Sequence, residues 1–271
     1  TTTPSPPSPP SPHLSRLLLS PTPPPQLGVI PARYASVRFP GKPLVPIAGV
    51  PMIVRTWRQA RRASTLTRLV VATDDPRIRD ACESAGAEVV MTSGDLPNGT
   101  ERCAAAHEAL GGGFDVVVNI QGDEPLIDPS VVDDVVRALQ ASPDAVYSTV
   151  ATNLRAEEVT MRSRVKVVVD QLGYAIYFSR SVIPGGKSGE PDASFPYLLH
   201  LGLQCYDATF LRLYPALPAT PLQTREDLEQ LKVIEHGYRM RVVTTAHAGH
   251  GVDEPEDVAK VEAILRDAGE A

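Results

Sequence analysis

Three basic residues lie in a loop of small residues directly after the first apolar run of the chain. The stretch VIPARYASVRFPGKPL, residues 29–44, carries Arg33, Arg38 and Lys42 among Ala, Ser, Gly and Pro. Small residues let backbone N–H groups approach a ligand, and three cations can neutralise several phosphate oxygens at once. The loop is not a Walker A motif, because Lys42 precedes Pro43, and it lacks the GxGxxG spacing. The pattern favours polyphosphate binding over a solvated basic loop.

Two further segments carry acidic residues that could hold a metal ion. In VVVNIQGDEP, Asp123 follows an apolar run, and in HGVDEPED, Asp253 precedes a helical pattern. Mg²⁺ prefers one or two carboxylates together with phosphate oxygens, so an acid beside a phosphate-binding loop suits it. Each acid has an ordinary alternative, because Gly-Asp and Glu-Pro are common in turns and Asp253 could cap a helix with Glu256 three residues on. With the basic loop nearby, the metal interpretation becomes competitive.

The second half of the chain adds polar residues suited to a hydroxylated, acidic ligand. Arg180 in FSRSVIP could clamp a carboxylate, and LLHLGLQCY carries His200, Gln204 and Tyr206. A lone histidine in an apolar strand is more often a core residue whose hydrogen bonds are satisfied. The residues alone therefore do not identify His200 as part of a site.

Composition excludes several classes of protein. The chain has 271 residues, of which 42% are hydrophobic, so it can bury a full core as one large or two small domains. A formal net charge of -6 argues against a dedicated nucleic-acid binder. Cys82, Cys103 and Cys205 form no CxxC pair, which disfavours a disulfide scaffold and a structural zinc site. No apolar run is long enough to cross a bilayer.

The first 25 residues differ in composition from the rest. Ten of the 27 prolines fall there among Ser and Thr, which predicts an extended, disordered segment. The first residue is not Met, so the chain is interpreted as a fragment or a processed form. His13, Arg16 and the Leu run could be the remains of a targeting segment, although a solvated linker has the same composition. The compartment is left open between the cytoplasm and an organelle or endomembrane.

From residue 26 onward, short β-branched runs alternate with amphipathic stretches. This alternation predicts an α/β fold with a mostly parallel sheet flanked by helices, in which ligands bind at the carboxyl ends of the strands. The expected strands are residues 27–32, 67–73, 87–91 and 115–120, and the expected helices are residues 51–63, 76–85 and 100–110.

The pattern changes after about residue 150. RVKVVVD and YAIYFS flank the turn Gln171-Leu172-Gly173, which predicts an antiparallel hairpin, and residues 198–206 follow as another strand. Helical patterns resume at residues 224–237 and 254–268. We therefore expect a single domain over residues 26–271 with a β-rich lobe at approximately 160–220.

Ten motifs in order resemble one known family, the 3-deoxy-manno-octulosonate cytidylyltransferases, or CMP-Kdo synthetases. The resemblance runs from about Gly28 to Arg266, and NGTERC and PLQ are closer to the plant and algal members than to the bacterial ones. The motifs are VIPARYASVRFPGKPL, AGVPMI, VVATDD, NGTER, VNIQGDEPLI, VKVVVD, GYAIYFSR, HLGLQCY, EDLEQLK and GVDEPEDV.

The resemblance implies a Rossmann-like nucleotidyltransferase fold with a β-rich lobe for sugar binding and dimerisation, usually in a homodimer. Such enzymes use Mg²⁺ to join CTP and 3-deoxy-manno-octulosonate (Kdo) into CMP-Kdo with release of pyrophosphate. This reaction activates Kdo for cell-surface or cell-wall polysaccharide. The resemblance implies the triphosphate contacts Arg33, Arg38 and Lys42, the metal ligands Asp123 and Asp253, the nucleotide contacts Ala32, Asn98, Gly99 and Thr100, and the Kdo contacts Gln121, Arg180, His200 and Glu226.

The chain departs from the bacterial pattern at three places. Asn98 stands where bacterial members have Ser, Gln223 stands where they have Glu, and Met161-Arg162-Ser163-Arg164 replaces an Asn-Pro-Asn stretch. The segment GGKSGEPDASFP, residues 185–196, is expected to be a mobile surface loop whose ordering accompanies substrate binding.

Three alternatives remain from the sequence. A synthetase for sialic acid or another sugar acid should differ in the FSR and HLG motifs. A glycosyltransferase would not need three cations for a leaving pyrophosphate, and a non-catalytic homologue should have lost a metal ligand or a loop cation.

Overall fold

A central twisted sheet organises the molecule. The computed structural model describes residues 25–35, 39–187, 189–247 and 249–269. Residues 1–24 of the predicted Pro-rich segment, and Arg38, lie outside these residues. The strands are β1 (Gln26–Ala32), β2 (Pro46–Ile47), β3 (Val50–Pro51), β4 (Arg68–Thr73), β5 (Glu88–Met91), β6 (Val116–Asn119), β7 (Ala145–Asn153), β8 (Lys166–Val169), β9 (Ala175–Ser179), β10 (Leu198–Asp207) and β11 (Arg239–Thr245).

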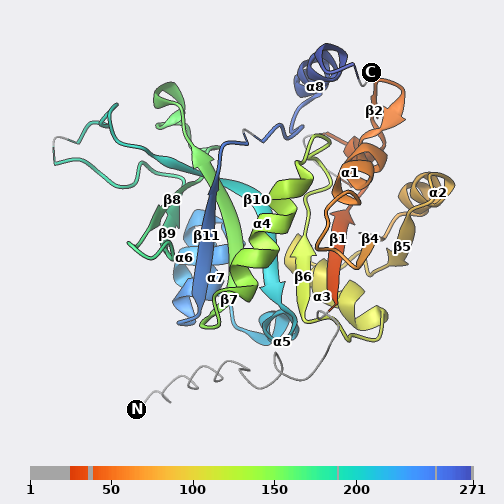
Figure 1. Ribbon diagram of the computed structural model, residues 1–271, viewed down its shortest axis with the longest axis horizontal. Helices are drawn as coiled ribbons and strands as arrows, with labels where there is room; N and C mark the ends of the chain where they lie inside the picture. Colours follow the sequence, from red (N-terminus) through yellow and green to blue (C-terminus); the bar gives the residue numbers. More distant parts are fainter. Residues whose placement is uncertain (1–24, 36–38, 188, 248, 270–271) are drawn as a thin grey trace.

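The sheet runs in the order β11-β7-β10-β6-β1-β4-β5 (Figure 1). β6, β1, β4 and β5 are parallel to their neighbours in this half, and β11 is parallel to β7. β10 enters between β6 and β7 and is antiparallel to both. The predicted fold class, a mostly parallel sheet flanked by helices, is confirmed.

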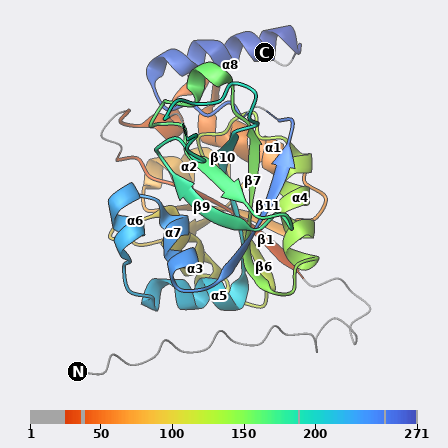
Figure 2. The same cartoon turned by 90° about the vertical axis from the view of Figure 1, so that its left-hand side faces the viewer.

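Helices cover both faces of the sheet (Figure 2). α1, α2 and α4 pack on one face, and α3, α5 and α7 pack on the other. Their bounds, with those of the remaining helices, are α1 (Met52–Ala60), α2 (Pro76–Ser84), α3 (Gly99–Ala109), α4 (Pro129–Gln140), α5 (Ala208–Leu213), α6 (Pro221–Glu226), α7 (Glu229–Glu235) and α8 (Pro255–Asp267), with 3-10 turns at Lys42–Leu44, Ala156–Glu158 and Tyr214–Ala216. Among the described residues, none of these helices has the length and apolarity that a membrane span requires.

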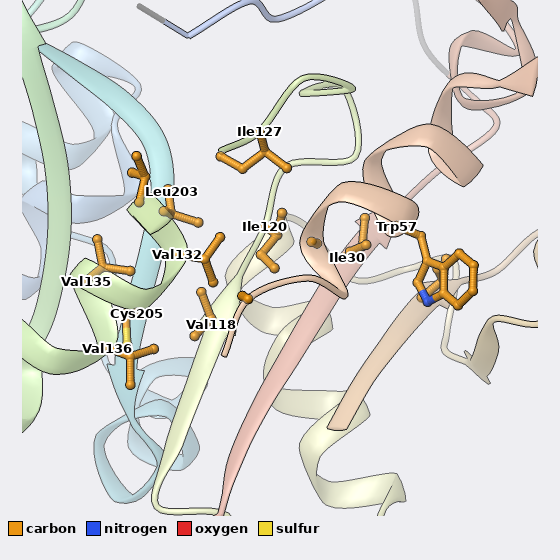
Figure 3. Packing of buried hydrophobic residues seen from close by; sticks show 14 of the residues in the cluster. Ile30, Trp57, Val118, Ile120, Ile127, Val132, Val135, Val136, Leu203 and Cys205 are labelled. Atoms are coloured by element: carbon orange, nitrogen blue, oxygen red, sulfur yellow. The ribbon is translucent and has the colours of Figure 1, made fainter. Parts of the chain in front are cut away.

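The parallel strands are apolar on both faces because both faces are covered. Ile30 and Val118 face α1 and α4, whereas their neighbours Val29 and Val117 face α3. The first of these two cores is shown in Figure 3, where Val132, Val135 and Val136 of α4 lie beside residues of β6 and β10. Full burial of such side chains contributes about 1.5–3 kcal/mol each and fixes the strand ends that carry the polar loops.

One buried carboxylate connects α4 to the loop before β4. The Asp133 side chain accepts hydrogen bonds from four donors before β4, the backbone N–H and hydroxyl of Ser64 and those of Thr65, at 2.6–3.2 Å. Burial alone would raise the pKa of Asp133, but these four donors outweigh it and the pKa lies below its ordinary value. The carboxylate thus fixes α4 against the segment that joins α1 to β4.

The predicted hairpin is confirmed: β8 and β9 are antiparallel and flank the turn at Gly173. Tyr174, after this turn, forms an antiparallel bridge with Arg241 of β11. The strands β11, β7, β10, β8 and β9 therefore curl until the hairpin meets β11 again.

The expected single helix over residues 224–237 is wrong. α6 ends at Glu226, Asp227 adopts a left-handed conformation with φ 54°, and α7 begins at Glu229. A residue with this φ cannot continue a right-handed helix, so the chain turns sharply between two short helices. The break matters because Glu226 and Glu229 then face different partners.

Candidate functional site

The basic loop begins where β1 ends. Gly41 has φ 71°, and its backbone N–H donates to the Tyr34 carbonyl at 3.0 Å. A Cβ there would lie 3.1 Å from the Tyr34 hydroxyl, in a conformation that favours glycine. The Arg77 guanidinium stacks over the Tyr34 ring, with its central carbon 3.3 Å from the ring centroid. This packing sets the position from which Lys42 leaves the loop.

Lys42 contacts both acids that the sequence singled out. Its Nζ lies 2.6 Å from Asp123 Oδ2 and 3.6 Å from Asp253 Oδ1. The two carboxylates come from segments 130 residues apart, yet one ammonium group reaches both. The structure therefore brings these three predicted residues together at the carboxyl edge of the sheet.

Backbone contacts explain why the two acidic segments converge. The Val252 N–H donates to the Asp123 carbonyl at 2.9 Å, so the segment before α8 lies against the loop after β6. Gly122 permits close packing of that loop, since a Cβ there would lie 3.0 Å from Ile53 Cδ1 and 3.1 Å from the Pro31 carbonyl.

Asp253 does not cap α8. The N-cap is Glu254, and Asp257 completes a capping box with it. The capping alternative with Glu256 is therefore wrong, and the Asp253 carboxylate lies beside Lys42.

Glu124, directly after Asp123, is a further carboxylate at this edge. Burial, with a smaller effect of the neighbouring Asp123 charge, raises its pKa to about 7. Its Oε2 is buried and has no hydrogen-bond partner among the described residues. An unpaired carboxylate oxygen next to two further acids makes this edge strongly attractive to a cation.

Asp123 and Asp253 fit a magnesium ion. Within the part of the chain that the structure describes, no group of three or more His, Cys, Asp or Glu side chains is arranged to hold a metal. Mg²⁺ does not need such a group, because one or two carboxylates with phosphate oxygens and water suffice. A cation, the Lys42 ammonium, already lies between the two carboxylates.

Arg102 is a residue that the sequence reasoning missed. Its side chain is 1% exposed, and its Nη1 donates to Thr92 Oγ1 at 2.6 Å and lies 3.2 Å from Asp74 Oδ1. Its Nη2 and the Nη2 of Arg33 are both buried without a hydrogen-bond partner among the described residues. Burial, with the Arg33 charge nearby, lowers the pKa of Arg102. The NGTER motif contains Arg102, which is the signal that could have indicated it.

The predicted nucleotide-binding residues Asn98, Gly99 and Thr100 form the start of α3. Asn98 is the N-cap, and its Oδ1 accepts from the Glu101 N–H at 2.8 Å. The Thr100 side chain is fully buried and points into the protein, where its hydroxyl lies 2.5 Å from Glu229 Oε2. Thr100 therefore has a packing role in addition to any contact that its backbone makes. Ala32 is the last residue of β1; it is buried and directly precedes Arg33.

Two of the predicted Kdo contacts, Glu226 and Arg180, contact each other. Glu226 Oε1 accepts from the Ser179 hydroxyl at 2.6 Å, and Oε2 accepts from the Arg180 N–H at 3.0 Å. Burial opposes ionisation of Glu226, but these hydrogen bonds outweigh it and lower its pKa. The Arg180 guanidinium donates to the carbonyls of Glu226, Asp227 and Arg162. Arg180 thus holds the break between α6 and α7 against the end of β9.

His200 has protein partners on both ring nitrogens. Its Nε2 lies 2.8 Å from Thr149 Oγ1, and its Nδ1 lies 3.4 Å from Gln230 Nε2. Thr149 donates its own proton to the Leu203 carbonyl, so Nε2 must be the donor and Nδ1 the acceptor. The surrounding protein lowers the pKa of His200 to about 4. The imidazole is therefore neutral and fixed in one tautomer.

Gln121, the fourth predicted Kdo contact, lies just after the end of β6 and two residues before Asp123. Its Nε2 donates to Asn119 Oδ1 at 3.3 Å. Gln121 is therefore next to the acidic edge, whereas the structure brings Arg180, Glu226 and His200 together with the helices α6 and α7.

A Rossmann-like sheet with basic residues and paired aspartates at its carboxyl edge is the arrangement expected of a nucleotidyltransferase. A family profile described as Cytidylyltransferase matches residues 27–242. The 3-deoxy-manno-octulosonate cytidylyltransferase of Zea mays is 58% identical over 240 residues, 89% of this chain and 80% of the relative. The relative in Arabidopsis thaliana, named as mitochondrial, is 58% identical over 241 residues, 89% of this chain and 83% of its own length.

A solved structure of CMP:2-keto-3-deoxy-manno-octonic acid synthetase complexed with CTP has the same fold. It superposes with a TM-score of 0.84 at 36% identity and covers 90% of this chain and 99% of its own. The chain belongs to the cytidylyltransferase family, and within it to the 3-deoxy-manno-octulosonate cytidylyltransferases. The family predicted from the ten motifs is confirmed.

Proposed function

We propose that this chain transfers CMP from CTP to the anomeric hydroxyl of Kdo, giving CMP-Kdo and pyrophosphate. The convergence of Lys42, Asp123 and Asp253 carries the proposal, because one ammonium group and two carboxylates at one point suit a triphosphate and its metal ion. The names of the relatives and of the CTP-bound structure support the choice of CTP and Kdo.

The triphosphate side uses charge and position. In the reaction, the anomeric oxygen of Kdo forms a bond to the α-phosphorus of CTP as the bond to the bridging oxygen of pyrophosphate breaks, and the hydroxyl proton is released to solvent. Arg33, Arg38 and Lys42 hold the triphosphate, and the buried Nη2 of Arg33 is a donor ready for such an anion. The carboxylates of Asp123 and Asp253 would hold Mg²⁺, which when bound would supply positive charge for the leaving pyrophosphate. No covalent protein nucleophile is needed.

Lys42 has two partners to satisfy in turn. Its ammonium compensates the charge of Asp123, and a Mg²⁺ ion held by the two carboxylates would compensate that charge instead. Lys42 is then available to phosphate oxygens at the same place. The Lys42 ammonium thus reduces the repulsion between the Asp123 and Asp253 carboxylates.

The base and sugar subsites follow the remaining predictions. Ala32, Asn98, Gly99 and Thr100 bind the cytidine, with Asn98 holding the start of α3 through its cap. The side chains that bind Kdo are Gln121, Arg180, His200 and Glu226. Arg180 binds the sugar carboxylate by exchanging some of its carbonyl partners for it, and a homodimer completes the assembly.

The test is pyrophosphate release from CTP and Mg²⁺ with Kdo, with N-acetylneuraminic acid and with no sugar acid. We expect release with Kdo alone, and loss of it in Asp123→Asn. Asp128→Asn is the matched control, because Asp128 lies in the same loop and caps α4 through Ser130 N–H, and asparagine caps equally well.

Each other outcome has a distinct meaning. Release with N-acetylneuraminic acid would assign the chain to sialic acid activation. No release from a folded protein that binds CTP would favour a non-catalytic homologue. Retained activity in Asp123→Asn would remove Asp123 from the metal site. Sedimentation of the purified protein tests the homodimer separately.

A further inference from the structure

A buried chain of hydrogen bonds begins at Glu229, the first residue of α7. Glu229 Oε2 lies 2.5 Å from the hydroxyl oxygen of Thr100, which lies 2.8 Å from the hydroxyl oxygen of Tyr206. Tyr206 in turn lies 2.7 Å from Gln204 Oε1, two residues before it on β10. Thr100 and Tyr206 are at most 1% exposed, and Gln204 is 8% exposed, so water does not supply their hydrogen bonds.

The chain continues through two amides to the acidic edge. Asn119, paired with Gln204 across β6 and β10, donates its Nδ2–H to Gln204 Oε1 at 2.9 Å. Gln121 Nε2 donates to Asn119 Oδ1 at 3.3 Å. Two residues beyond Gln121 lies Asp123, the proposed metal ligand. The chain therefore joins α7, on the sugar side, to the place where the two substrates must meet.

The number of protons limits how the first part of this chain can be arranged. Three oxygen–oxygen contacts follow one another, from Glu229 to Thr100, to Tyr206 and to Gln204. Each contact needs one proton between its oxygens, and the two hydroxyl groups supply only two. The third proton must come from a protonated Glu229 carboxyl group or from the amide of Gln204.

These two sources give the chain two directions. With Glu229 protonated, each oxygen donates towards Gln204 Oε1, and Asn119 and Gln121 keep the orientation described above. With Glu229 ionised, Thr100 donates to the carboxylate and Tyr206 donates to Thr100. Gln204 must then turn its NH₂ towards Tyr206, and Asn119 and Gln121 must exchange their amide O and N as well.

The direction decides which atom of Gln121 is available to a ligand. In the protonated direction Gln121 uses its NH₂ on Asn119 and offers its carbonyl oxygen. In the ionised direction it accepts from Asn119 and offers its NH₂. An anionic sugar acid prefers the NH₂ donor and is repelled by the carbonyl oxygen.

We propose that Glu229 is a positioning residue, which acts through Thr100, Tyr206, Gln204 and Asn119 to set whether Gln121 offers a donor or an acceptor to the sugar acid. This inference rests on the proposed function, in which Gln121 contacts Kdo. It predicts that binding of the sugar acid and ionisation of Glu229 are coupled, and that the coupling is carried by the Tyr206 hydroxyl.

The surroundings of Glu229 raise its pKa above the ordinary value of a glutamate. Burial raises its pKa, hydrogen bonds from Thr100 oppose this, and the charges of Glu101 and Asp227 raise it further. The titratable groups that face it from the elements packed against it are Glu101 and Cys103 of α3, Asp227 before α7, Lys232 of α7, Tyr147 of β7, Tyr206 of β10 and Tyr214. With the carboxyl group more readily protonated than an exposed one, both directions of the chain can be populated.

The experiment measures KM for Kdo and kcat of the full-length protein from about pH 5 to pH 8. In the wild type, KM for Kdo should fall about tenfold as Glu229 ionises, since a hydrogen bond to a charged ligand is gained. Glu229→Gln cannot ionise, and Tyr206→Phe interrupts the chain, so both should lose this part of the profile while kcat changes little. Because Glu124 titrates beside Asp123, the readout is the difference between wild-type and variant profiles.

Glu235→Gln is the matched control. Glu235 lies on the same helix and also accepts hydrogen bonds, from the N–H groups of Leu222 and Gln223, but it is not part of the chain. This variant should keep the wild-type profile. A wild-type profile in Glu229→Gln would overturn the proposal. A normal profile in Tyr206→Phe together with a flat one in Glu229→Gln would also overturn it, since Glu229 would then act without the chain.

Failure of the proposed function has a different signature. A wild type that releases no pyrophosphate with Kdo at any pH refutes the function before any variant is made, and the inference is refuted with it. Thermal unfolding of the variants verifies that they are folded. A wild-type pH profile in either Glu229→Gln or Tyr206→Phe would overturn the proposal, so one folded variant is enough for the test.

Discussion

Replacing Lys42 by methionine should strengthen metal binding while it weakens catalysis. Lys42 Nζ lies 2.6 Å from Asp123 Oδ2 and 3.6 Å from Asp253 Oδ1, so its ammonium occupies the space between the carboxylates that would hold Mg²⁺. In the absence of nucleotide the lysine and the metal compete for these acids. Methionine keeps the length of the side chain and removes the competing charge.

The contact distance sets the size of the effect. At 2.6 Å, a pair of unit charges attracts with about 1.6 kcal/mol in a medium like water and about 6 kcal/mol at an effective dielectric constant near 20. The lower value is the better guide, because the Lys42 and Asp123 side chains keep 15% and 31% of their surface exposed. Removing this competition should tighten Mg²⁺ binding about tenfold.

Two assays on the same protein separate the metal from the nucleotide. Calorimetric titration with Mg²⁺ in the absence of CTP should show the tighter binding in Lys42→Met. Pyrophosphate release should show kcat/KM for CTP lowered about 100-fold, since a cation for the triphosphate is lost. Lys260→Met is the control, because Lys260 pairs with Asp257 on the exposed surface of α8. Unchanged or weaker Mg²⁺ binding in Lys42→Met would refute this reasoning and remove the two acids from the metal site.

Three further predictions concern single side chains. Asn98→Ser should change the free energy of unfolding by less than about 0.5 kcal/mol, because serine also caps helices, whereas Asn98→Ala should cost about 1 kcal/mol in urea unfolding. Asp133→Ala should destabilise the protein by about 2–4 kcal/mol in the same assay, since four donors from Ser64 and Thr65 lose their acceptor, and a cost below about 1 kcal/mol would contradict it. His200 has a native pKa of about 4, so between about pH 6.5 and pH 4 the unfolded state binds a proton that the native state excludes, and the protein should lose up to about 3 kcal/mol as the pH falls. His200→Gln should lose that part of the pH dependence. If the imidazole of His200 titrates near pH 6.5 in NMR spectra, the reasoning is wrong.

The parallel half of the fold was predictable because its signals are local. β1, β4, β5 and β6 are short β-branched runs, and α1 and α2 lie between them in the sequence with clear amphipathic patterns. The starts of such helices are also written in the sequence, as at Asp75, whose side chain accepts from Arg77 N–H before a proline.

The rest of the fold depends on contacts between distant residues. β7 includes Ser148, Thr149 and Thr152, whose buried hydroxyl groups dilute its apolar pattern. The hydroxyl groups of Ser148 and Thr149 donate to carbonyl groups of other elements, those of Val135 and Leu203. The break at Asp227 depends on a left-handed residue that local propensity does not predict.

The candidate site divides in the same way. Residue types and motifs indicated Lys42, Asp123 and Asp253, and the structure brings them together. Arg102 and Glu229 could not be found from their own types, since a charged residue on a helix is normally exposed. Only tertiary contacts show that one Arg102 nitrogen lacks a hydrogen-bond partner in the described part of the structure and that the Glu229 carboxyl group begins a buried chain of hydrogen bonds.

The position of β10 has a consequence for synthesis of the chain on the ribosome. β6 and β7 emerge early, but the strand that separates them in the sheet ends at residue 207. Until β10 has been translated, β6 has one open edge, and β7 has neither of its neighbours because β11 comes later still. Open edges pair readily with other chains. A truncated product that stops after β7 should therefore aggregate, and the nascent chain must keep these edges apart from other chains until the second half arrives.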